Sequence, residues 1–322
     1  MTVRTGRSEI SRPRRAVGAD NRLSDEPAKG VSRTTQSEPM TNPTPSNGNR
    51  YQLKVAEVEC RNALVKSGIE GLDYALNPYT GCQHACVYCY AEFMKKYTNH
   101  DEDWGDFVDA KVNVVERLEG QIKRTRPGSV QMGTVTDAYQ PSEERFRLSR
   151  GCLEVLADSD FSVTIQTKSD LVLRDIDILK KMKNREVGLT ITCHDPEVET
   201  LFEPGASNLD RRLDALKRLK RAGIPTYVFF GPILPFFSDH QDSLLLFFRR
   251  LEKTGVNKVY LDKMNYLKGK RKKISRVLRE NYPHALRFYD GVVERGEDYA
   301  EWLKATLDST LSRFPFEPEI LF

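Results

Sequence analysis

Three cysteines within eight residues are the side chains of this sequence best placed to do chemistry. Cys82, Cys86 and Cys89 follow a C-x3-C-x2-C spacing inside the stretch NPYTGCQHACVYCY, residues 77–90. A short loop can wrap three thiolates around one soft metal centre, such as an iron–sulfur cluster, without ligands from distant strands. Three protein ligands leave a coordination position open, and an open position distinguishes a reactive metal site from a closed structural one.

His84 lies between the first two of these cysteines and allows a second interpretation of the loop. Three thiolates and one imidazole could form a Cys3His zinc site, which would belong to a non-enzymatic binding protein. Four ligands packed between Cys82 and Cys89 lack the distant second pair of an ordinary zinc fold, so the iron–sulfur interpretation is favoured. A disulfide framework is disfavoured, because six scattered cysteines in 322 residues are not typical of a small secreted scaffold.

The residues that surround the cysteines narrow the interpretation. The run GCQHACVYCY, residues 81–90, resembles the signature of the radical S-adenosylmethionine (SAM) superfamily, and within it the branch related to spore photoproduct lyase and loosely called DNA repair photolyases. The resemblance implies that the three cysteines hold a 4Fe–4S cluster whose free iron binds SAM. It also implies reductive cleavage of SAM to a 5′-deoxyadenosyl radical, which abstracts hydrogen from a substrate. An electron donor such as ferredoxin or flavodoxin would supply the electron.

Composition divides the chain near residue 50. Residues 1–50 hold nine Lys or Arg, five Asp or Glu and no aromatic side chain, and we expect a disordered, basic tail there. The tail accounts for the whole net charge of +4, so the neutral remainder indicates no particular partner by charge alone. No apolar run approaches the roughly 20 residues that cross a bilayer. We therefore expect a cytoplasmic protein without membrane contact; the oligomeric state stays open.

Behind the tail, strand and helix patterns alternate. A short strand over Leu72–Leu76 leads into the cysteine loop, and five further strands are predicted at Val130–Val135, Phe161–Thr167, Val187–Thr192, Thr226–Phe230 and Lys258–Leu261. Apolar residues at helical spacing predict helices over Lys111–Arg124, Glu143–Leu156, Asp175–Met182, Asn208–Ala222 and Asp242–Lys253. This alternation is typical of right-handed βαβ units and a parallel sheet, either open or closed into a barrel.

The family resemblance decides between these architectures. It implies an α/β fold that forms a partial (β/α)6 barrel of TIM type over residues 51–265. Residues 266–322 are expected to form a helical C-terminal extension. In such barrels the reactive side chains lie at the C-terminal ends of the strands.

Hydroxyl and charged side chains stand at several of these strand ends. Thr136 and Asp137 follow the second strand and could bind the ammonium or ribose of SAM, although Asp137 could instead cap the next helix. Lys168 follows the third strand, where it would pair with the SAM carboxylate or form an ordinary surface charge. Thr190 and Thr192 share one face of the fourth strand, and their hydroxyls could serve the ribose or the methionyl group.

Two further features bear on the cofactor and on the hydrogen donor. Glu203 and Arg211 lie in a stretch that resembles the family's EPxA…RR pattern, and either could contact the cofactor or form a salt bridge. Residues 227–235 resemble the apolar segment against which the adenine would pack. Spore photoproduct lyases carry a hydrogen-donating Cys ahead of their Ser/Thr-Asp pair, whereas this chain has Gly133 and Thr134. Cys193 is predicted to face away from Thr192, so the sequence does not predict spore photoproduct repair.

The substrate is predicted from the resemblance and from one basic run. The run KGKRKK, residues 268–273, should lie near the barrel mouth, where it could bind phosphates or form a solvated loop. A damaged or modified nucleic acid is therefore one candidate. A peptide or small metabolite would suit the same radical chemistry.

Overall fold

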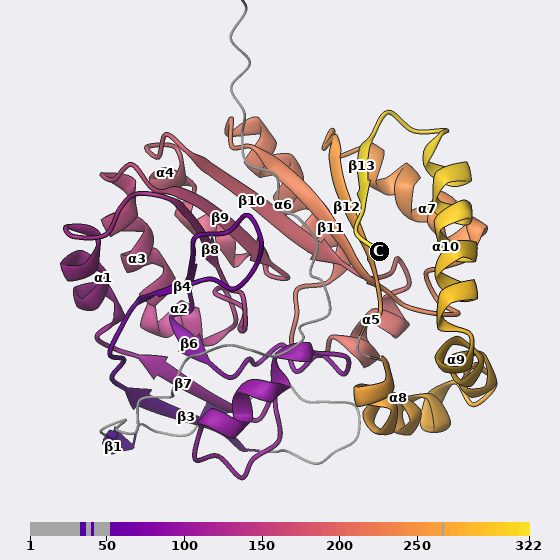
Figure 1. Ribbon diagram of the computed structural model, residues 1–322, viewed down its shortest axis with the longest axis horizontal. Helices are drawn as coiled ribbons and strands as arrows, with labels where there is room; N and C mark the ends of the chain where they lie inside the picture. The colour runs from indigo at the N-terminus through magenta and orange to yellow at the C-terminus, as the bar shows by residue number, and fades with distance from the viewer. Residues whose placement is uncertain (1–32, 37–39, 42–51, 266) are drawn as a thin grey trace, which may run out of the picture.

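The computed structural model describes residues 33–36, 40–41, 52–265 and 267–322. Its framework is an eight-stranded sheet in the order β13-β12-β11-β10-β9-β8-β5-β4, in which all neighbours are parallel except β4 and β5 (Figure 1). The strands are β4 (Leu64–Lys66), β5 (Tyr74–Leu76), β8 (Ser129–Met132), β9 (Ser162–Thr167), β10 (Arg185–Ile191), β11 (Thr226–Ile233), β12 (Lys258–Lys263) and β13 (Glu317–Ile320). All six strands predicted for the barrel are present, and the sheet is open, as a partial barrel requires.

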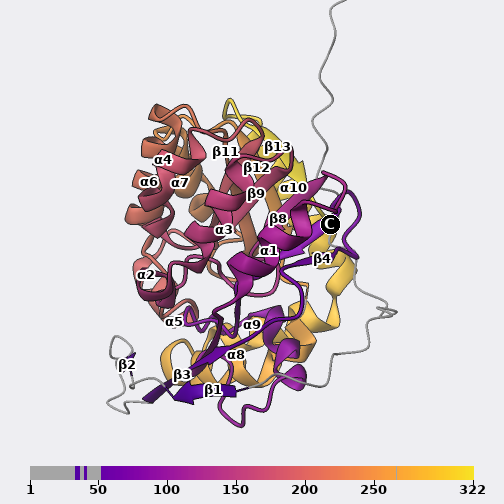
Figure 2. The same ribbon diagram turned by 90° about the vertical axis from the view of Figure 1, so that its left-hand side faces the viewer.

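Helices cover the outer face of this sheet (Figures 1 and 2). They are α1 (Val114–Ile122), α3 (Leu148–Ala157), η2 (Asp170–Asp175), α4 (Ile176–Leu179), α6 (Leu209–Arg221) and α7 (Gln241–Glu252). Two short helices lie at the ends of the strands: α2 (Ser142–Phe146) contacts β7 (Phe107–Lys111), and α5 (Pro196–Phe202) packs against α8 (Leu267–Asn281). The single helix predicted over Glu143–Leu156 is in fact two, α2 and α3. Arg147 separates them with a left-handed backbone (φ 52°), which an α-helix cannot include.

The two faces of the sheet differ in chemistry because successive side chains of a strand point to opposite sides. The outer face is apolar and buried against the helices: Val130, Met132, Val163, Ile165, Val187, Leu189, Val228, Phe230, Val259 and Leu261. The inner face alternates with it and carries polar and aromatic residues: Gln131, Thr164, Gln166, Glu186, Thr190, Tyr227, Phe229, Lys258, Tyr260 and Asp262. Burial of the apolar outer face against the helices stabilises the sheet, so the inner face can carry polar groups and bind a ligand.

A second, smaller sheet carries the cysteine loop. It has the order β1-β3-β7-β6, with β2 beside β3, and its strands are β1 (Arg33–Gln36), β2 (Met40–Thr41), β3 (Gln52–Val58), β6 (Tyr79–Thr80) and β7 (Phe107–Lys111). The sequence did not predict β7, and the helix expected from Lys111 begins at Val114. Most of the predicted tail, residues 1–50, lies outside the described residues; within it, β1 and β2 pair antiparallel with β3.

The C-terminal segment contributes three helices and the last strand. The helices are α8 (Leu267–Asn281), α9 (Ala285–Glu294) and α10 (Gly296–Leu311), and β13 then pairs in parallel with β12. The basic run lies on helix α8 and is therefore not a loop. Lys270 and Lys273 of α8 form ion pairs with Glu92 of η1 (Tyr90–Tyr97), the 3-10 helix that follows the cysteine loop.

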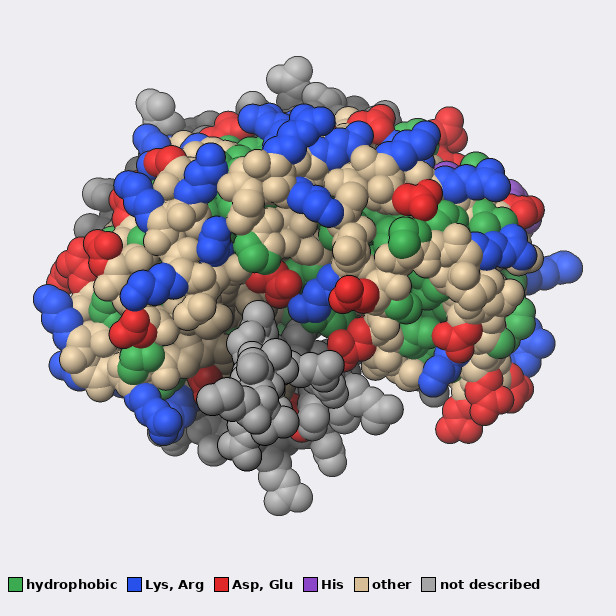
Figure 3. Space-filling view, turned by 90° about the horizontal axis from the view of Figure 1, so that it is seen from above, with side chains coloured by type: hydrophobic (Ala, Val, Ile, Leu, Met, Phe, Trp, Pro, Cys, Tyr) green, Lys and Arg blue, Asp and Glu red, His purple; other side chains and the backbone are tan. Residues whose placement is uncertain are grey.

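Figures 1 and 2 show the small sheet and α8 together at the end of the main sheet where its parallel strands finish. Figure 3 looks onto the opposite end, where acidic and basic side chains are mixed over the surface. None of the helices in the described part of the chain is both long and apolar enough to span a membrane.

Candidate metal centre and cofactor site

The cysteine loop joins β6 to η1 and presents three free thiols in a desolvated site. Burial raises the pKa of Cys82, Cys86 and Cys89, that of Cys86 to about 12, and the negative charge of neighbouring thiolates adds to the effect at Cys82 and Cys86. Neighbouring thiolates that are poorly hydrated need a cationic centre to compensate their charge. Three free thiols within one short loop are a donor set that suits an iron–sulfur cluster.

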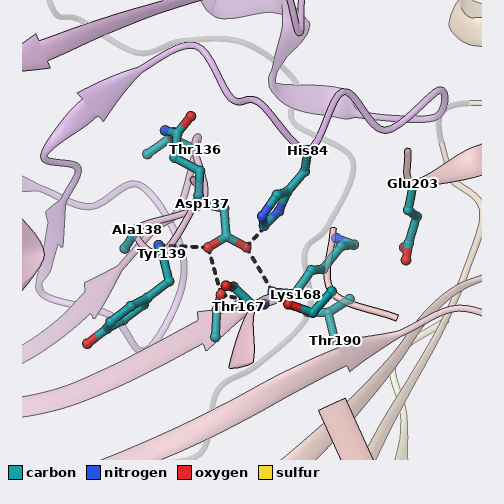
Figure 4. Close-up of polar contacts among 12 residues, drawn as sticks. His84, Thr136, Asp137, Ala138, Tyr139, Thr167, Lys168, Thr190 and Glu203 are labelled. Carbon is teal, nitrogen blue, oxygen red and sulfur yellow. Dashed lines mark hydrogen bonds and ion pairs between the residues drawn. The ribbon is translucent and has the colours of Figure 1, made fainter. Parts of the chain in front are cut away.

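His84 does not join the cysteines. It is 2% exposed, and its Nδ1 lies 3.3 Å from Oδ2 of Asp137, toward which the ring points (Figure 4). Within the described ranges, no three His, Cys, Asp or Glu side chains, the loop cysteines included, form a group already arranged to hold a metal ion. The position of His84 therefore gives no support to the Cys3His zinc alternative.

Two glycines let other backbone segments approach the loop closely. Gly81 has a φ of +85°, and a Cβ there would overlap the carbonyl oxygen of Phe107 in β7. A Cβ at Gly205 would overlap the carbonyl oxygen of Gln83, and the Gly205 amide donates to the His84 carbonyl at 3.1 Å. A side chain at either position would push the loop away, so both positions require glycine.

Residues that follow β8 brace the loop by hydrogen bonds. The Thr136 hydroxyl donates to the Gly81 carbonyl at 2.6 Å, and Nε2 of Gln140 donates to the Thr136 hydroxyl at 3.1 Å. Oε1 of Gln140 accepts from the Gln83 amide at 2.9 Å. The sequence analysis did not identify Gln140 as a site residue. It could have been found from its position four residues after Thr136, because that spacing places two side chains on the same side of a turn.

Asp137 joins the loop to β8 and β9 (Figure 4). One carboxylate oxygen accepts from the Tyr139 amide at 2.9 Å and the Thr167 hydroxyl at 2.6 Å; the other accepts from the Lys168 amide at 2.8 Å and pairs with His84. Burial works to raise the pKa of Asp137, but His84 and these donors lower it well below its usual value. The carboxylate is thus ionised and fully engaged by protein donors. Contact with the SAM ammonium stays a prediction.

Lys168 places its positive charge beside the loop cysteines. Its Nζ lies 5.7 Å from the centre of the Tyr88 ring. Burial works to lower the pKa of Lys168, but the negative charges of a Cys86 thiolate and of the Glu203 carboxylate raise it overall, so the ammonium remains charged. A fixed cation here can stabilise thiolates or bind a carboxylate ligand.

A buried ion pair holds the side of the site next to β10. Arg212 is fully buried; it donates to Oε2 of Glu203 at 2.5 Å and to the Thr190 carbonyl at 2.9 Å. Oε1 of Glu203 accepts from the hydroxyls of Tyr88 and Thr192, the latter at 3.1 Å. Glu203 therefore forms a salt bridge that links the cysteine loop to the end of β10, and the Thr192 hydroxyl is already in use.

Arg211, which the sequence singled out with Glu203, lies elsewhere. Its side chain is 63% exposed and pairs with Asp170 at 2.8 Å. Helix α6 begins after Asn208, whose side chain accepts from the Arg211 amide at 3.0 Å, and this start turns Arg212 toward the core with Leu209 and Leu213. The starting residue of the helix thus decides which of two adjacent arginines is buried.

His100 predicts a pH dependence of stability. Its ring lies 3.0 Å from Glu102 and 2.9 Å from Asp109 and stacks on Phe107, with the ring centres 4.0 Å apart. Burial works to lower the pKa of His100, but its bonds to Asp109 and Glu102 raise it above 6.5 overall. The protonated ring therefore stabilises the fold at low pH, and this contribution is lost as the pH rises through the folded-state pKa.

We expect His100→Gln to remove this part of the pH dependence. Urea unfolding between about pH 5.5 and 8.5 should show a smaller loss of stability with rising pH in the variant than in the wild type. His240→Gln is the control, because the side chain of His240 is 52% exposed. Equal slopes for His100→Gln and the wild type would contradict the assignment.

Comparison with known proteins agrees with this geometry. Residues 76–248 match the Radical SAM superfamily, so the chain belongs to the radical SAM superfamily, whose members are enzymes that use a 4Fe–4S cluster and SAM. An uncharacterized protein of Methanocaldococcus jannaschii is 35% identical over 234 residues, which are 73% of this chain and 86% of that protein. The radical SAM Nalpha-GlyT isomerase of Pseudomonas phage M6 is 23% identical over 56% of this chain and 37% of the isomerase.

Solved structures show the same fold. A mutant of spore photoproduct lyase with bound AdoMet and dinucleoside spore photoproduct superposes with a TM-score of 0.62. The match covers 84% of this chain and 82% of the lyase, at 17% identity. At this identity the likeness concerns the fold, which is that of spore photoproduct lyase.

Proposed function

We propose that this radical SAM enzyme holds a 4Fe–4S cluster through Cys82, Cys86 and Cys89 and acts by hydrogen abstraction on a damaged or modified nucleic acid. The observation that carries the proposal is a single loop at the strand ends that holds three free thiols, with the Lys168 ammonium close enough to act on two of them. When bound, the cluster would supply the electron that cleaves SAM to a hydrogen-abstracting 5′-deoxyadenosyl radical.

The cofactor contacts are proposed from the positions of five side chains. Lys168 has a charged ammonium beside the cysteines and would bind the SAM carboxylate. Thr136 and Asp137 are engaged with the loop and with β9, and they would position the methionyl end through that framework. Thr190 and Thr192 are buried at the end of β10 and would bind the ribose. With these contacts, SAM would lie across the ends of the strands, next to the iron that has no protein ligand.

Support for a nucleic-acid substrate comes partly from the surface of η1. Phe93 and Tyr97 are 44% and 48% exposed, and Nζ of Lys96 lies 5.8 Å and 4.7 Å from their ring centres. Exposed aromatic rings beside cations can stack bases and contact phosphates. Helix α8 supplies less free charge than its sequence indicates, because Lys270 and Lys273 are paired with Glu92.

One of the solved structures points the same way. The spore photoproduct lyase mutant holds AdoMet and dinucleoside spore photoproduct. The missing Cys ahead of Thr136 argues against repair of spore photoproduct itself. Cys193 is buried, its thiol donates to the Asp195 carbonyl at 3.5 Å, and it packs with Phe202 in an apolar cluster. A different hydrogen donor, or a reaction that needs none, is therefore proposed.

The inner face of the sheet offers a place for the reacting group. The Tyr227 ring lies over Gly188, and its hydroxyl donates to Oε1 of Gln166 at 3.2 Å. Tyr260 packs edge-on against Tyr227 with ring centres 5.2 Å apart, and its buried hydroxyl has no acceptor among the described residues. The nearby Lys258 ammonium is a donor only, so the Tyr260 hydroxyl hydrogen has no acceptor until a ligand arrives.

We expect Tyr260→Phe to lower substrate-dependent formation of 5′-deoxyadenosine by roughly 5- to 10-fold, since one hydrogen bond to a neutral group is worth about 1 kcal/mol. Cleavage of SAM without substrate should be unchanged. Tyr289→Phe is a matched control, because the Tyr289 hydroxyl is also buried and without a partner among the described residues but lies on α9. Equal effects of the two substitutions would rule out a substrate contact at Tyr260.

Anaerobic reconstitution tests the proposal. The protein should bind about four irons, turn brown and release 5′-deoxyadenosine with dithionite, or with ferredoxin or flavodoxin and a reductase. All six cysteines are free, which suits the reducing cytoplasm that we propose as its location. Colourless protein that binds one zinc would overturn the radical chemistry.

A separate experiment addresses the substrate. DNA and RNA that carry damaged or modified bases should stimulate deoxyadenosine formation, and deuterium placed on the base should move into the product. Peptides and small metabolites serve as the competing substrate classes. Stimulation by one of those, with no response to any nucleic acid, would remove the nucleic-acid proposal and leave the radical SAM assignment intact.

A further inference from the structure

Trp104 is buried against the cysteine loop. It lies in the turn before β7, is 5% exposed, and packs edge-on against Phe107 with ring centres 5.8 Å apart and an interplanar angle of 87°. Cys82 and Ala91 belong to the same apolar cluster, and Cys89 packs against it. The indole therefore borders the thiols that would hold the cluster.

The indole N–H of Trp104 has no conventional hydrogen-bond partner. Its Nε1 is one of a few buried side-chain atoms in the described part of the chain that make no hydrogen bond to nitrogen, oxygen or sulfur within ordinary limits. A buried donor without an acceptor is costly, and such a group in a native fold calls for an explanation. A ligand or an ionised neighbour that reaches the site would remove this cost.

The Cys89 sulfur is the acceptor that the geometry offers. The Cys89 side chain packs against the small apolar cluster that contains the Trp104 indole. Burial raises the pKa of the Cys89 thiol, while Lys168, the Ala91 amide and the Trp104 indole N–H act to lower it. A neutral thiol is a weak acceptor, whereas a metal-bound thiolate carries negative charge and is a good one. The interaction is therefore weak in the thiol form and becomes strong when Cys89 binds iron.

We infer that Trp104 donates an N–H···S hydrogen bond to the cluster-bound sulfur of Cys89 and thereby raises the reduction potential of the cluster. Reduction adds negative charge to the cluster and its thiolates, so a fixed donor stabilises the reduced form more than the oxidised form. Trp104 would therefore make it easier for the electron donor to reduce the cluster. It is a positioning and tuning residue and does not touch the reacting atoms. This inference rests on the proposed cluster.

Trp104→Phe provides the first test, because phenylalanine keeps an aromatic ring against Phe107 and removes the N–H donor along with the pyrrole ring that carries it. The midpoint potential of the reconstituted cluster, measured without SAM by a redox titration followed by electron paramagnetic resonance, should become more negative at unchanged iron content. Trp302→Phe is the control; Trp302 is the other of the two tryptophans, is 45% exposed and lies on α10. An unchanged potential in Trp104→Phe would overturn the inference.

A second measurement leaves Trp104 in place. In the Trp302→Phe protein labelled with indole ¹⁵N, Trp104 carries the only indole nitrogen. Electron–nuclear double resonance of the reduced cluster should show coupling to this nitrogen and to a proton that exchanges in D2O. A normal cluster without such coupling would overturn this inference alone, whereas wild-type protein that holds no iron would overturn the proposed function together with it.

Discussion

Cys86→Ala should abolish both the brown colour of the reconstituted protein and its formation of 5′-deoxyadenosine. Cys86 is one of only three thiols in the loop, and its loss leaves two thiolates for a cluster that already has one iron without a protein ligand. Iron and sulfide analysis, absorbance and product formation measure the effect. Circular dichroism should show that the variant remains folded, because the loop is also held by Thr136, Gln140 and Gly205.

Cys60→Ala is the matched control for this prediction. Cys60 is a free, partly buried thiol whose backbone bonds to Asn113, far from the loop in the fold. Its substitution should leave iron content and product formation unchanged. A Cys86→Ala protein that retained the full iron content would show that the loop does not hold the cluster.

Arg212→Met should lower the free energy of unfolding by about 3–5 kcal/mol, because removing one partner of a buried ion pair leaves the other charge uncompensated. Two carboxylates depend on Arg212: Glu203, 2.5 Å away, and Glu199, 3.1 Å away. Burial works to raise the pKa of Glu203, while Arg212 and then Lys168 lower it overall, so the substitution should also leave Glu203 protonated more readily. Urea unfolding measures the loss of stability.

The adjacent Arg211 supplies an unusually close control. Arg211→Met removes the same functional group one residue earlier on α6, but from an exposed pair with Asp170. Its effect should stay within about 0.5 kcal/mol, as for most surface substitutions. If both variants lost similar stability, the buried pair would not be the source of the effect.

Much of the main sheet could be predicted because its strands are apolar runs separated by amphipathic helices. β9 and β12 begin within a residue of the predicted positions, and α6 begins and ends within a residue of the helix predicted over Asn208–Ala222. β7 could not be predicted in this way, because FVDAK is short and half polar and becomes a strand only by pairing with β3 and β6. Such a pairing depends on contacts distant in sequence, which local propensity does not contain.

The site shows the same division between local and long-range information. The spacing of the cysteines and the position of Lys168 at a strand end were visible in the sequence. The hydrogen bonds from Gln140 to the loop, and the burial of Arg212 in place of Arg211, could not be predicted from the sequence. Each depends on the residue at which a turn or helix starts. Trp104 gave no signal at all, because a tryptophan in a polar loop reveals neither its burial nor its orphaned N–H.

Asp137 joins parts of the chain that lie far apart in the sequence. One carboxylate fastens the cysteine loop, through His84, to the adjoining ends of β8 and β9, through Tyr139, Thr167 and Lys168. These contacts couple the loop to the strand ends, so a disturbance of one would displace the other. The proposed ligands of the cluster and the proposed contacts of SAM therefore share a single framework.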